Sequence, residues 1–241
     1  MSRIPNNFGI SLVTLKSSFS FLKIKTVPRL FWSAPHPLTI RPPLISMVLL
    51  VVGLVIFGFG EALMIASGVG VSPWTVLAQG IANIIGLSVG LSTFVVSVIV
   101  LLVWVPLRQT PGIGTFLNII IISVVLDLAL PWLPKFESLT LRVAEAAFGV
   151  IVTGIRGGIY LIANLGPGPR DGLMTGLVQL TGFPVAGVRS AIEISVVLLG
   201  WSLGGVVGVG TLMYAFGIGP CVAASMYILF KAFEDGPPEQ S

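Results

Sequence analysis

Charged residues are scarce in this chain of 241 residues, since only 9% are Asp, Glu, Lys or Arg, against about 25% in a typical soluble domain. Two stretches contain none at all: 46 residues between Glu61 and Arg108, and 37 between Glu193 and Lys231. An apolar helix needs about 20 residues to cross a bilayer, so each stretch has room for two spans. Strand-like alternation is absent, which disfavours a β-barrel. With a mean hydropathy of +1.03, the chain is expected to be an all-α, polytopic helical membrane protein whose main partner is the lipid bilayer.

Cysteine and histidine are almost missing. Cys221 is the sole cysteine and His36 the sole histidine. One cysteine cannot form a disulfide within the chain, and a cluster of His and Cys metal ligands is excluded. A catalytic Cys–His or Ser–His pair would have to take His36 from the N-terminal region. We therefore expect no metal, no cofactor and no enzymatic activity.

Acidic residues are absent from the first 60 positions, which hold six basic ones, Arg3, Lys16, Lys23, Lys25, Arg29 and Arg41. Basic residues before a first span hold the N-terminus in the cytoplasm, and we prefer this interpretation to nucleic-acid binding. Residues 1–43 are expected to form a disordered cytoplasmic tail, and 234–241 a short C-terminal one. The protein should lie in a membrane with both termini cytoplasmic.

An internal repeat appears when the sequence is shifted by 96 residues. Six glycines then coincide over 58 positions, where chance predicts about one, so we expect two tandem homologous halves, 44–134 and 135–233. Motifs coincide as well, such as G-x-G-T at 112–115 and 208–211. Two related halves are a common plan in transporters.

Each half is expected to contain about four helical segments: 44–66 and 143–163, then 73–86 and 169–182, then 89–107 and 185–203, and finally 115–131 and 211–232. Pro73 and Pro169 suit the first turn of the short helices because proline lacks an N–H that would be unpaired there. Thr115 and Thr211 are expected N-caps.

The short helices leave the topology open. Eight spans would make the halves parallel and place the 131–142 loop in the cytoplasm with both termini. Six spans with two re-entrant helices would make the halves inverted. Lys135 and Arg142 in that loop favour eight spans, because cytoplasmic loops are rich in Lys and Arg.

Charges inside spans are costly and should face the helix bundle or water. Arg189 and Glu193, four residues apart on one helix, are expected to pair. Glu61 and Arg156 are expected to pair between the halves. Asp127 has no expected partner and is either an interfacial acid or a proton carrier.

The stretch GPGPRDGL places Arg170 and Asp171 at a helix start. Asp171 suits the first turn, where the helix dipole favours a carboxylate. The planar guanidinium of Arg170 either fixes the loop to a neighbouring acid or carbonyl, or binds an anionic ligand.

Four motifs, PWTVLAQG, PGIGTFLN, GPGPRDGLMTGL and VGVGTLMYAFGIGP, resemble the YczE/YyaS/YitT group of bacterial integral membrane proteins, closest to the YczE branch. The resemblance covers about 44–230 and implies a multi-pass inner-membrane protein without a known cofactor; small-molecule export has been suggested for relatives. In that group the first motif commonly reads Pro-Trp-Asp, whereas this chain has Thr75. The carboxylate symmetric to Asp171 is therefore missing.

The sequence and this resemblance together predict a permease that moves a small organic molecule through a cavity between the halves, and the resemblance alone favours export. Its expected cavity residues are Arg170, Asp171, Thr75, Trp74 and Asp127. The alternative is a membrane scaffold or assembly partner whose buried charges are structural. The substrate and the oligomeric state stay open.

Overall fold

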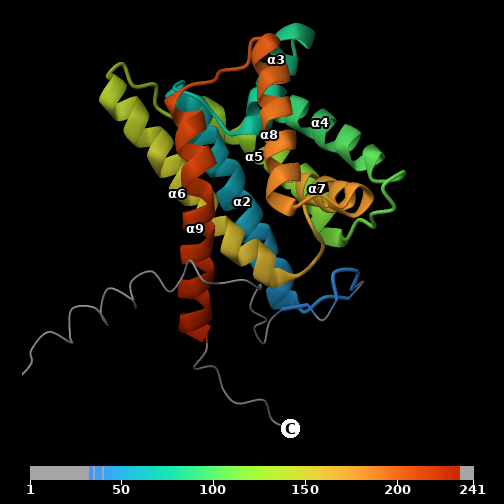
Figure 1. Cartoon of the computed structure of the whole chain (residues 1–241). Helices are drawn as coiled ribbons and strands as arrows, with labels where there is room; N and C mark the ends of the chain where they lie inside the picture. The colour runs from blue at the N-terminus through green and yellow to red at the C-terminus, as the bar shows by residue number, and fades with distance from the viewer. Residues whose placement is uncertain (1–32, 35, 40, 234–241) are drawn as a thin grey trace, which may run out of the picture.

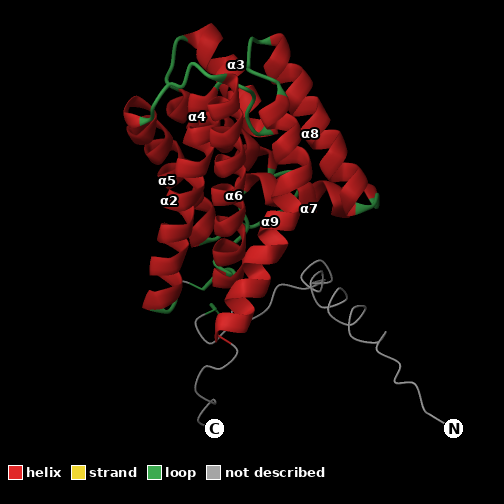
Figure 2. Cartoon of the chain, turned by 90° about the vertical axis from the view of Figure 1, so that its left-hand side faces the viewer, coloured by secondary structure: helices red, strands yellow, loops and turns green. Residues whose placement is uncertain are grey.

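The computed structural model of the chain describes residues 33, 34, 36–39 and 41–233. This part consists of helices and loops, with no strand in it (Figure 2). The all-α class expected from the composition is therefore confirmed for the described residues. The elements are α2 (Leu44–Ser67), α3 (Pro73–Ile85), α4 (Val89–Val103), α5 (Ile113–Ala129), the 3-10 turn η2 (Leu130–Trp132), α6 (Leu139–Ala163), α7 (Pro169–Thr181), α8 (Val185–Ser202) and α9 (Val209–Phe233).

Helices α2 and α6 pack antiparallel to each other. A Cβ atom on Gly60 would lie 2.9 Å from the carbonyl oxygen of Gly149, and one on Gly53 would lie 3.4 Å from Cγ2 of Ile159. Higher numbers on one helix therefore meet lower numbers on the other. Glycine permits this close approach, which matters because helices surrounded by lipid associate mainly through van der Waals packing.

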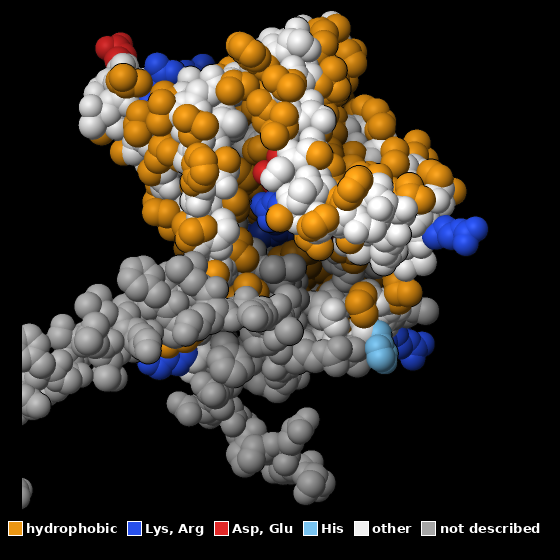
Figure 3. All heavy atoms as spheres, in the orientation of Figure 1, with side chains coloured by type: hydrophobic (Ala, Val, Ile, Leu, Met, Phe, Trp, Pro, Cys, Tyr) orange, Lys and Arg blue, Asp and Glu red, His pale blue; other side chains and the backbone are white. Residues whose placement is uncertain are grey.

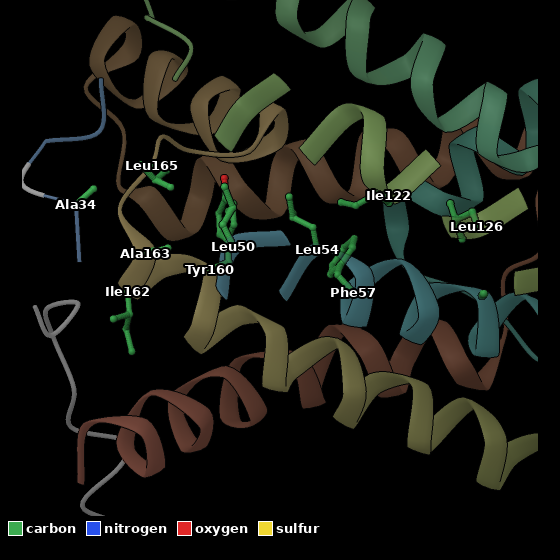
Figure 4. Packing of buried hydrophobic residues seen from close by; sticks show 11 residues of the cluster. Ala34, Leu50, Leu54, Phe57, Ile122, Leu126, Tyr160, Ile162, Ala163 and Leu165 are labelled. Carbon is green, nitrogen blue, oxygen red and sulfur yellow. The ribbon is translucent and has the colours of Figure 1, made fainter. Parts of the chain in front are cut away.

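Helix α9 packs parallel to α6, with Gly154 facing Cys221 and Gly158 facing Ser225. Figure 1 shows α2, α6 and α9 side by side, with the shorter helices α3, α4, α7 and α8 beside them. Helix α5 packs on α2 with Val125 against Gly58. The hydrophobic core where α2, α5 and α6 meet contains Leu54, Phe57, Ile122 and Tyr160 (Figure 4).

Backbone hydrogen bonds bring the start of one helix to the end of another. The Gly114 N–H donates to the carbonyl of Leu165 at 2.8 Å, so α5 begins where α6 ends. The Gly210 N–H donates to the carbonyl of Val69 at 2.9 Å, so α9 begins where α2 ends. If each short helix is counted with the helix that follows it, the chain within 44–233 passes between the two ends of the bundle six times, along α2, α3–α4, α5, α6, α7–α8 and α9. The start of α2 and the end of α9 lie at the same end of the bundle, here called the Leu44 end (Figure 1).

The expected position of the 131–142 loop is wrong. Arg142, at the start of α6, donates from Nε to the carbonyl of Ser67 at 2.6 Å and from Nη2 to that of Gly68 at 2.8 Å. The loop therefore lies at the opposite end of the bundle from the start of α2, and α2 and α6 run antiparallel where eight spans would make them parallel. The reason is that the chain bends by 112° between α3 and α4, so this pair forms one broken span or a re-entrant loop and not two separate spans.

The local signals for helix starts were partly right. Pro73 and Pro169 occupy the first helical position of α3 and α7, as expected. Thr115 and Thr211 are not N-caps, because α5 and α9 begin two residues earlier. Their hydroxyls instead accept the backbone N–H of Gly112 at 3.1 Å and of Gly208 at 3.3 Å. A third-position side chain that reaches back satisfies the same unpaired donors as an N-cap does.

Among the described residues, four helices are long and apolar enough to cross a bilayer, namely α2, α5 with η2, α8 and α9, and the bent pair α3–α4 adds a fifth if it is one span. Large apolar side chains cover much of the surface (Figure 3). Phe216, for example, is 79% exposed. A continuous apolar surface of this kind needs lipid around it.

Part of the expected disordered tail is packed. Ala34 is buried, its N–H donates to the carbonyl of Ala163 at 3.1 Å, and its carbonyl accepts from Nδ2 of Asn164 at 2.8 Å. This short segment therefore docks on the end of α6. The expectations for residues 1–32 and 234–241 lie outside the described residues.

Candidate functional site

A cavity of about 120 Å³ lies where seven helices and the loop before α7 meet. It gathers charges that are far apart in the sequence and lie on α6, α7 and α8. In Figure 3 charged side chains are visible in a recess of the otherwise apolar surface. The lining residues are Phe57, Pro73, Trp74, Asn118, Ile122, Arg156, Gly168, Pro169, Arg170, Asp171, Met174, Arg189, Ile192, Glu193 and Tyr214.

Arg156 does not pair with Glu61, contrary to expectation. Its guanidinium lies between two aromatic rings, 4.2 Å from the centroid of Phe57 and 4.2 Å from that of Tyr160. The Tyr160 hydroxyl donates to the carbonyl of Gly166 at 2.7 Å, which fixes the ring to the loop before α7. The buried Nε of Arg156 has no hydrogen-bond partner. Cation–π contacts hold the guanidinium in place without neutralising its charge.

Glu61 is bound elsewhere. This carboxylate is 1% exposed, and its Oε2 accepts the hydroxyls of Ser72 at 2.7 Å and Thr75 at 2.6 Å. Thr75, expected at the cavity, is therefore a buried partner of Glu61 and does not line it. Residues 68–72 lie between α2 and α3, and their return toward α2 brings these hydroxyls within reach. Sequence reasoning missed this contact because it depends on where the loop turns back.

Arg170, Asp171 and Trp74 do line the cavity, as expected. The Arg170 guanidinium lies 5.4 Å from the centroid of the Trp74 ring, and no carboxylate lies within ion-pairing distance of it in the described part of the chain. Asp171 lies in the first turn of α7, but no side chain caps that helix. Both charges thus face the cavity without the structural partners that were considered for them.

Arg189 and Glu193 form the expected pair, with Nε of Arg189 2.9 Å from Oε1 of Glu193. This is the one ion pair found within the described residues. Asp127, which was expected to be unpartnered and near the cavity, lies outside it. Its carboxylate accepts the Ser88 hydroxyl and, at 2.8 Å, the Gly90 N–H at the start of α4.

Two polar groups of the cavity were not anticipated. Asn118 on α5 is 8% exposed, and Tyr214 lies on α9. The two positions are 96 residues apart, so the shift that aligns the glycines could have identified them together. Neither side chain is hydrogen-bonded to another described residue, so both are free to contact a ligand.

The start of α7 is held by Trp104 at the end of α4. Its Nε1 donates to the carbonyl of Pro169 at 2.9 Å. Gly172 makes room for the indole, since a Cβ there would lie 1.9 Å from Cζ2 of Trp104. This contact fixes the position from which Arg170 and Asp171 reach the cavity.

The polar groups of the cavity are suited to binding an anion. No group of three His, Cys, Asp or Glu side chains that could hold a metal occurs in the described region. Guanidinium groups, helix starts and amide and phenol groups recognise anions. Phe57, Trp74, Ile122 and Ile192 supply apolar walls.

Comparison with known proteins identifies one family and several relatives. The family model described as "Family of unknown function (DUF6198)" matches residues 44–227. An "Uncharacterized protein" of Haemophilus influenzae is 42% identical over 209 residues, which cover 87% of this chain and 95% of that protein.

Two proteins of Bacillus subtilis are more distant. The "Uncharacterized membrane protein YczE" is 33% identical over 165 residues, covering 68% of this chain and 77% of that protein. The "Uncharacterized protein YyaS" is 28% identical over 166 residues, covering 67% and 83%. No solved structure matches the chain.

Proposed function

The chain belongs to the DUF6198 family and, with YczE and YyaS, to one group of membrane proteins, and we propose that it is a permease for a small organic molecule. The observation that carries this proposal is the cavity, which holds Arg156 and Arg170 without ion-pair partners among the described residues. Charges at membrane depth are costly and are retained mainly at sites of function. The preference for export rests on the resemblance to the group alone.

The cavity lies between two homologous halves, 44–134 and 135–233, in this proposal. Helices α7, α8 and α9 begin 96 residues after α3, α4 and α5 respectively. The loop contacts are reciprocal as well: Gly70 lies against Gly208, and Gly166 lies against Gly112. Because α2 and α6 are antiparallel, the halves would be inverted repeats. In transporters with inverted repeats the substrate binds at the interface between the repeats.

One extensive contact of the first half has no counterpart in the second, and we propose that this gap is a route of access. Helix α4 packs on α5 through Asp127, Ser88 and Gly90. No comparable packing joins α8 to α9 in the described chain, and the 96-residue shift puts Ala223 at the position of Asp127. The cavity would therefore open between α8 and α9, and transport would alternate this state with one in which α8 closes and α4 opens.

We propose that the Leu44 end faces the cytoplasm. Arg41 precedes α2, Arg108 precedes α5 and Lys231 lies in the last turn of α9, so these three exposed side chains lie near this end of the bundle in the chain. The other basic residues of the N-terminal region precede Arg41. The loop at 131–142 would then face the periplasm. A reporter enzyme fused after Ser138 should be active outside the cytoplasm, and cytoplasmic activity would refute the six-crossing topology.

A scaffold without transport is the second candidate. It is favoured by the Arg189–Glu193 pair and by the stacking of Arg156 on two rings, since both stabilise charges in the absence of a ligand. A scaffold would keep the cavity dry, whereas a permease admits water and polar reagents to it.

Water access is tested with single cysteines in a Cys221→Ala background. Met174→Cys and Ile192→Cys should react with a charged methanethiosulfonate, because both side chains line the cavity. Phe216→Cys, on an exposed apolar surface, and Leu54→Cys, in the core, are the matched controls that should not react. Protection of all four positions would refute the permease and favour the scaffold.

A further inference from the structure

We infer that the cargo of the cavity is a small aliphatic monocarboxylate. This inference rests on the proposed permease function and adds the chemical class of what the permease carries. It is argued from the charge, the polar contacts and the volume of the cavity.

The charge of the cavity is unbalanced. Arg189 and Glu193 neutralise each other. Of the remaining lining residues, Arg156 and Arg170 are cationic and Asp171 is anionic. This leaves one positive charge in excess among the lining residues, since the buried Glu61 carboxylate is outside the lining and is bound to Ser72 and Thr75. An uncompensated charge is destabilising in a low-dielectric site. A ligand with a single negative charge would make the cavity neutral, whereas a dianion or a cation would unbalance it again.

The free donors are arranged to meet a carboxylate. Arg156 has an unpartnered buried Nε, and its stacking between Phe57 and Tyr160 keeps the guanidinium plane fixed. A fixed planar fork matches a carboxylate in two-point contact better than a flexible ammonium does. The uncapped start of α7 adds backbone N–H donors and the positive end of a helix dipole.

The size and the walls of the cavity limit the rest of the molecule. A dry cavity of about 150 Å³ is known to hold benzene, so about 120 Å³ fits a ligand of about five or six non-hydrogen atoms. Phe57, Trp74, Ile122 and Ile192 offer apolar contact to a short hydrocarbon tail. Propionate has this charge, this size and this shape.

Binding is measured on the full chain in lipid nanodiscs by the shift in thermal unfolding midpoint, because a ligand of the folded state raises it. Propionate should raise the midpoint in a concentration-dependent manner. Propionamide, a neutral molecule of the same shape, and propylammonium, a cation, should not do so at equal ionic strength. Stabilisation by propionamide or propylammonium equal to that by propionate, or no stabilisation by propionate, overturns the inference.

Variants then assign the recognition to the two free guanidinium groups. Arg156→Gln and Arg170→Gln should each weaken propionate binding by about 10- to 100-fold, as expected for the loss of a charged hydrogen bond. Arg108→Gln, which lies outside the cavity, is the matched control and should bind normally. If Arg156→Gln does not fold, Arg156→Lys keeps the charge but loses the fork, and should still weaken binding. Unchanged affinity in the cavity variants overturns the assignment.

Flux into proteoliposomes separates the two proposals. Propionate binding without propionate flux would contradict the permease and leave the ligand class intact. Flux of propionamide without propionate binding would contradict the ligand class and leave the permease intact.

Discussion

Asp127→Ala should release α4 from α5. The carboxylate accepts one hydroxyl and one backbone N–H at the first turn of α4, and it also faces the positive end of that helix. Hydrogen bonds to a charged group contribute about 1.5–3 kcal/mol each when buried. Asp127 is half-buried and Ser88 is exposed. Solvent screening therefore reduces the combined contribution of the two hydrogen bonds to about 2 kcal/mol. That corresponds to a change of about 30-fold in the equilibrium constant between the docked and the undocked state of α4.

The assay is a pair of distance measurements between spin labels in a Cys221→Ala background. One pair, at Leu91 and Leu128, reports on α4 and α5, and the other, at Ile194 and Phe216, reports on α8 and α9; all four side chains are exposed. In Asp127→Ala the first distance should lengthen. If the two contacts alternate during transport, the second distance should shorten at the same time.

The matched control is Ser88→Ala, which removes one of the two hydrogen bonds and should give a smaller shift of about 5-fold. A longer α4–α5 distance with an unchanged α8–α9 distance would refute the alternation, because the Asp127 contact would then be structural only. No change in either distance would refute the energetic estimate itself.

Three further outcomes concern stability. Gly172→Ala should destabilise the protein by about 1–3 kcal/mol, because the new Cβ overlaps Trp104; Gly187→Ala, which has open space around it, should melt like the parent, and equal melting of both would refute the overlap. Arg142→Ala should lower the free energy of unfolding by about 1–3 kcal/mol, because it removes two hydrogen bonds to the end of α2. A melting temperature equal to that of the parent would contradict this expectation. Glu145→Gln should raise stability by about 1 kcal/mol, because the buried carboxylate has no partner among the described residues; a lower melting temperature would show that the charge is compensated.

The boundaries of the helices could be predicted from the sequence because they depend on neighbouring residues. Pro73 and Pro169 start α3 and α7 where expected, and Gly86 and Gly182 end them with the left-handed conformation that glycine readily adopts. The charge-free stretches made the membrane class evident. The motifs that resemble the YczE group led to a family that the comparisons confirm.

The partners of the charged residues could not be predicted in the same way. Arg189 and Glu193 pair because spacing on one helix fixes their contact. Glu61 and Arg156 lie on different helices, and nothing local reveals that Ser72 and Thr75 reach Glu61 first.

The sequence by itself determined where helices form, since hydropathy, proline and glycine act over a few residues. Only the tertiary structure decided how often the chain crosses. A helix of 13 residues, such as α3, reaches about 20 Å and cannot cross a bilayer alone, so the topology depends on the 112° angle between α3 and α4. That angle follows from packing against distant helices, as does the meeting of Arg156 and Arg170 at one cavity. Contacts of that kind are fixed by the whole arrangement and are not encoded in any single segment.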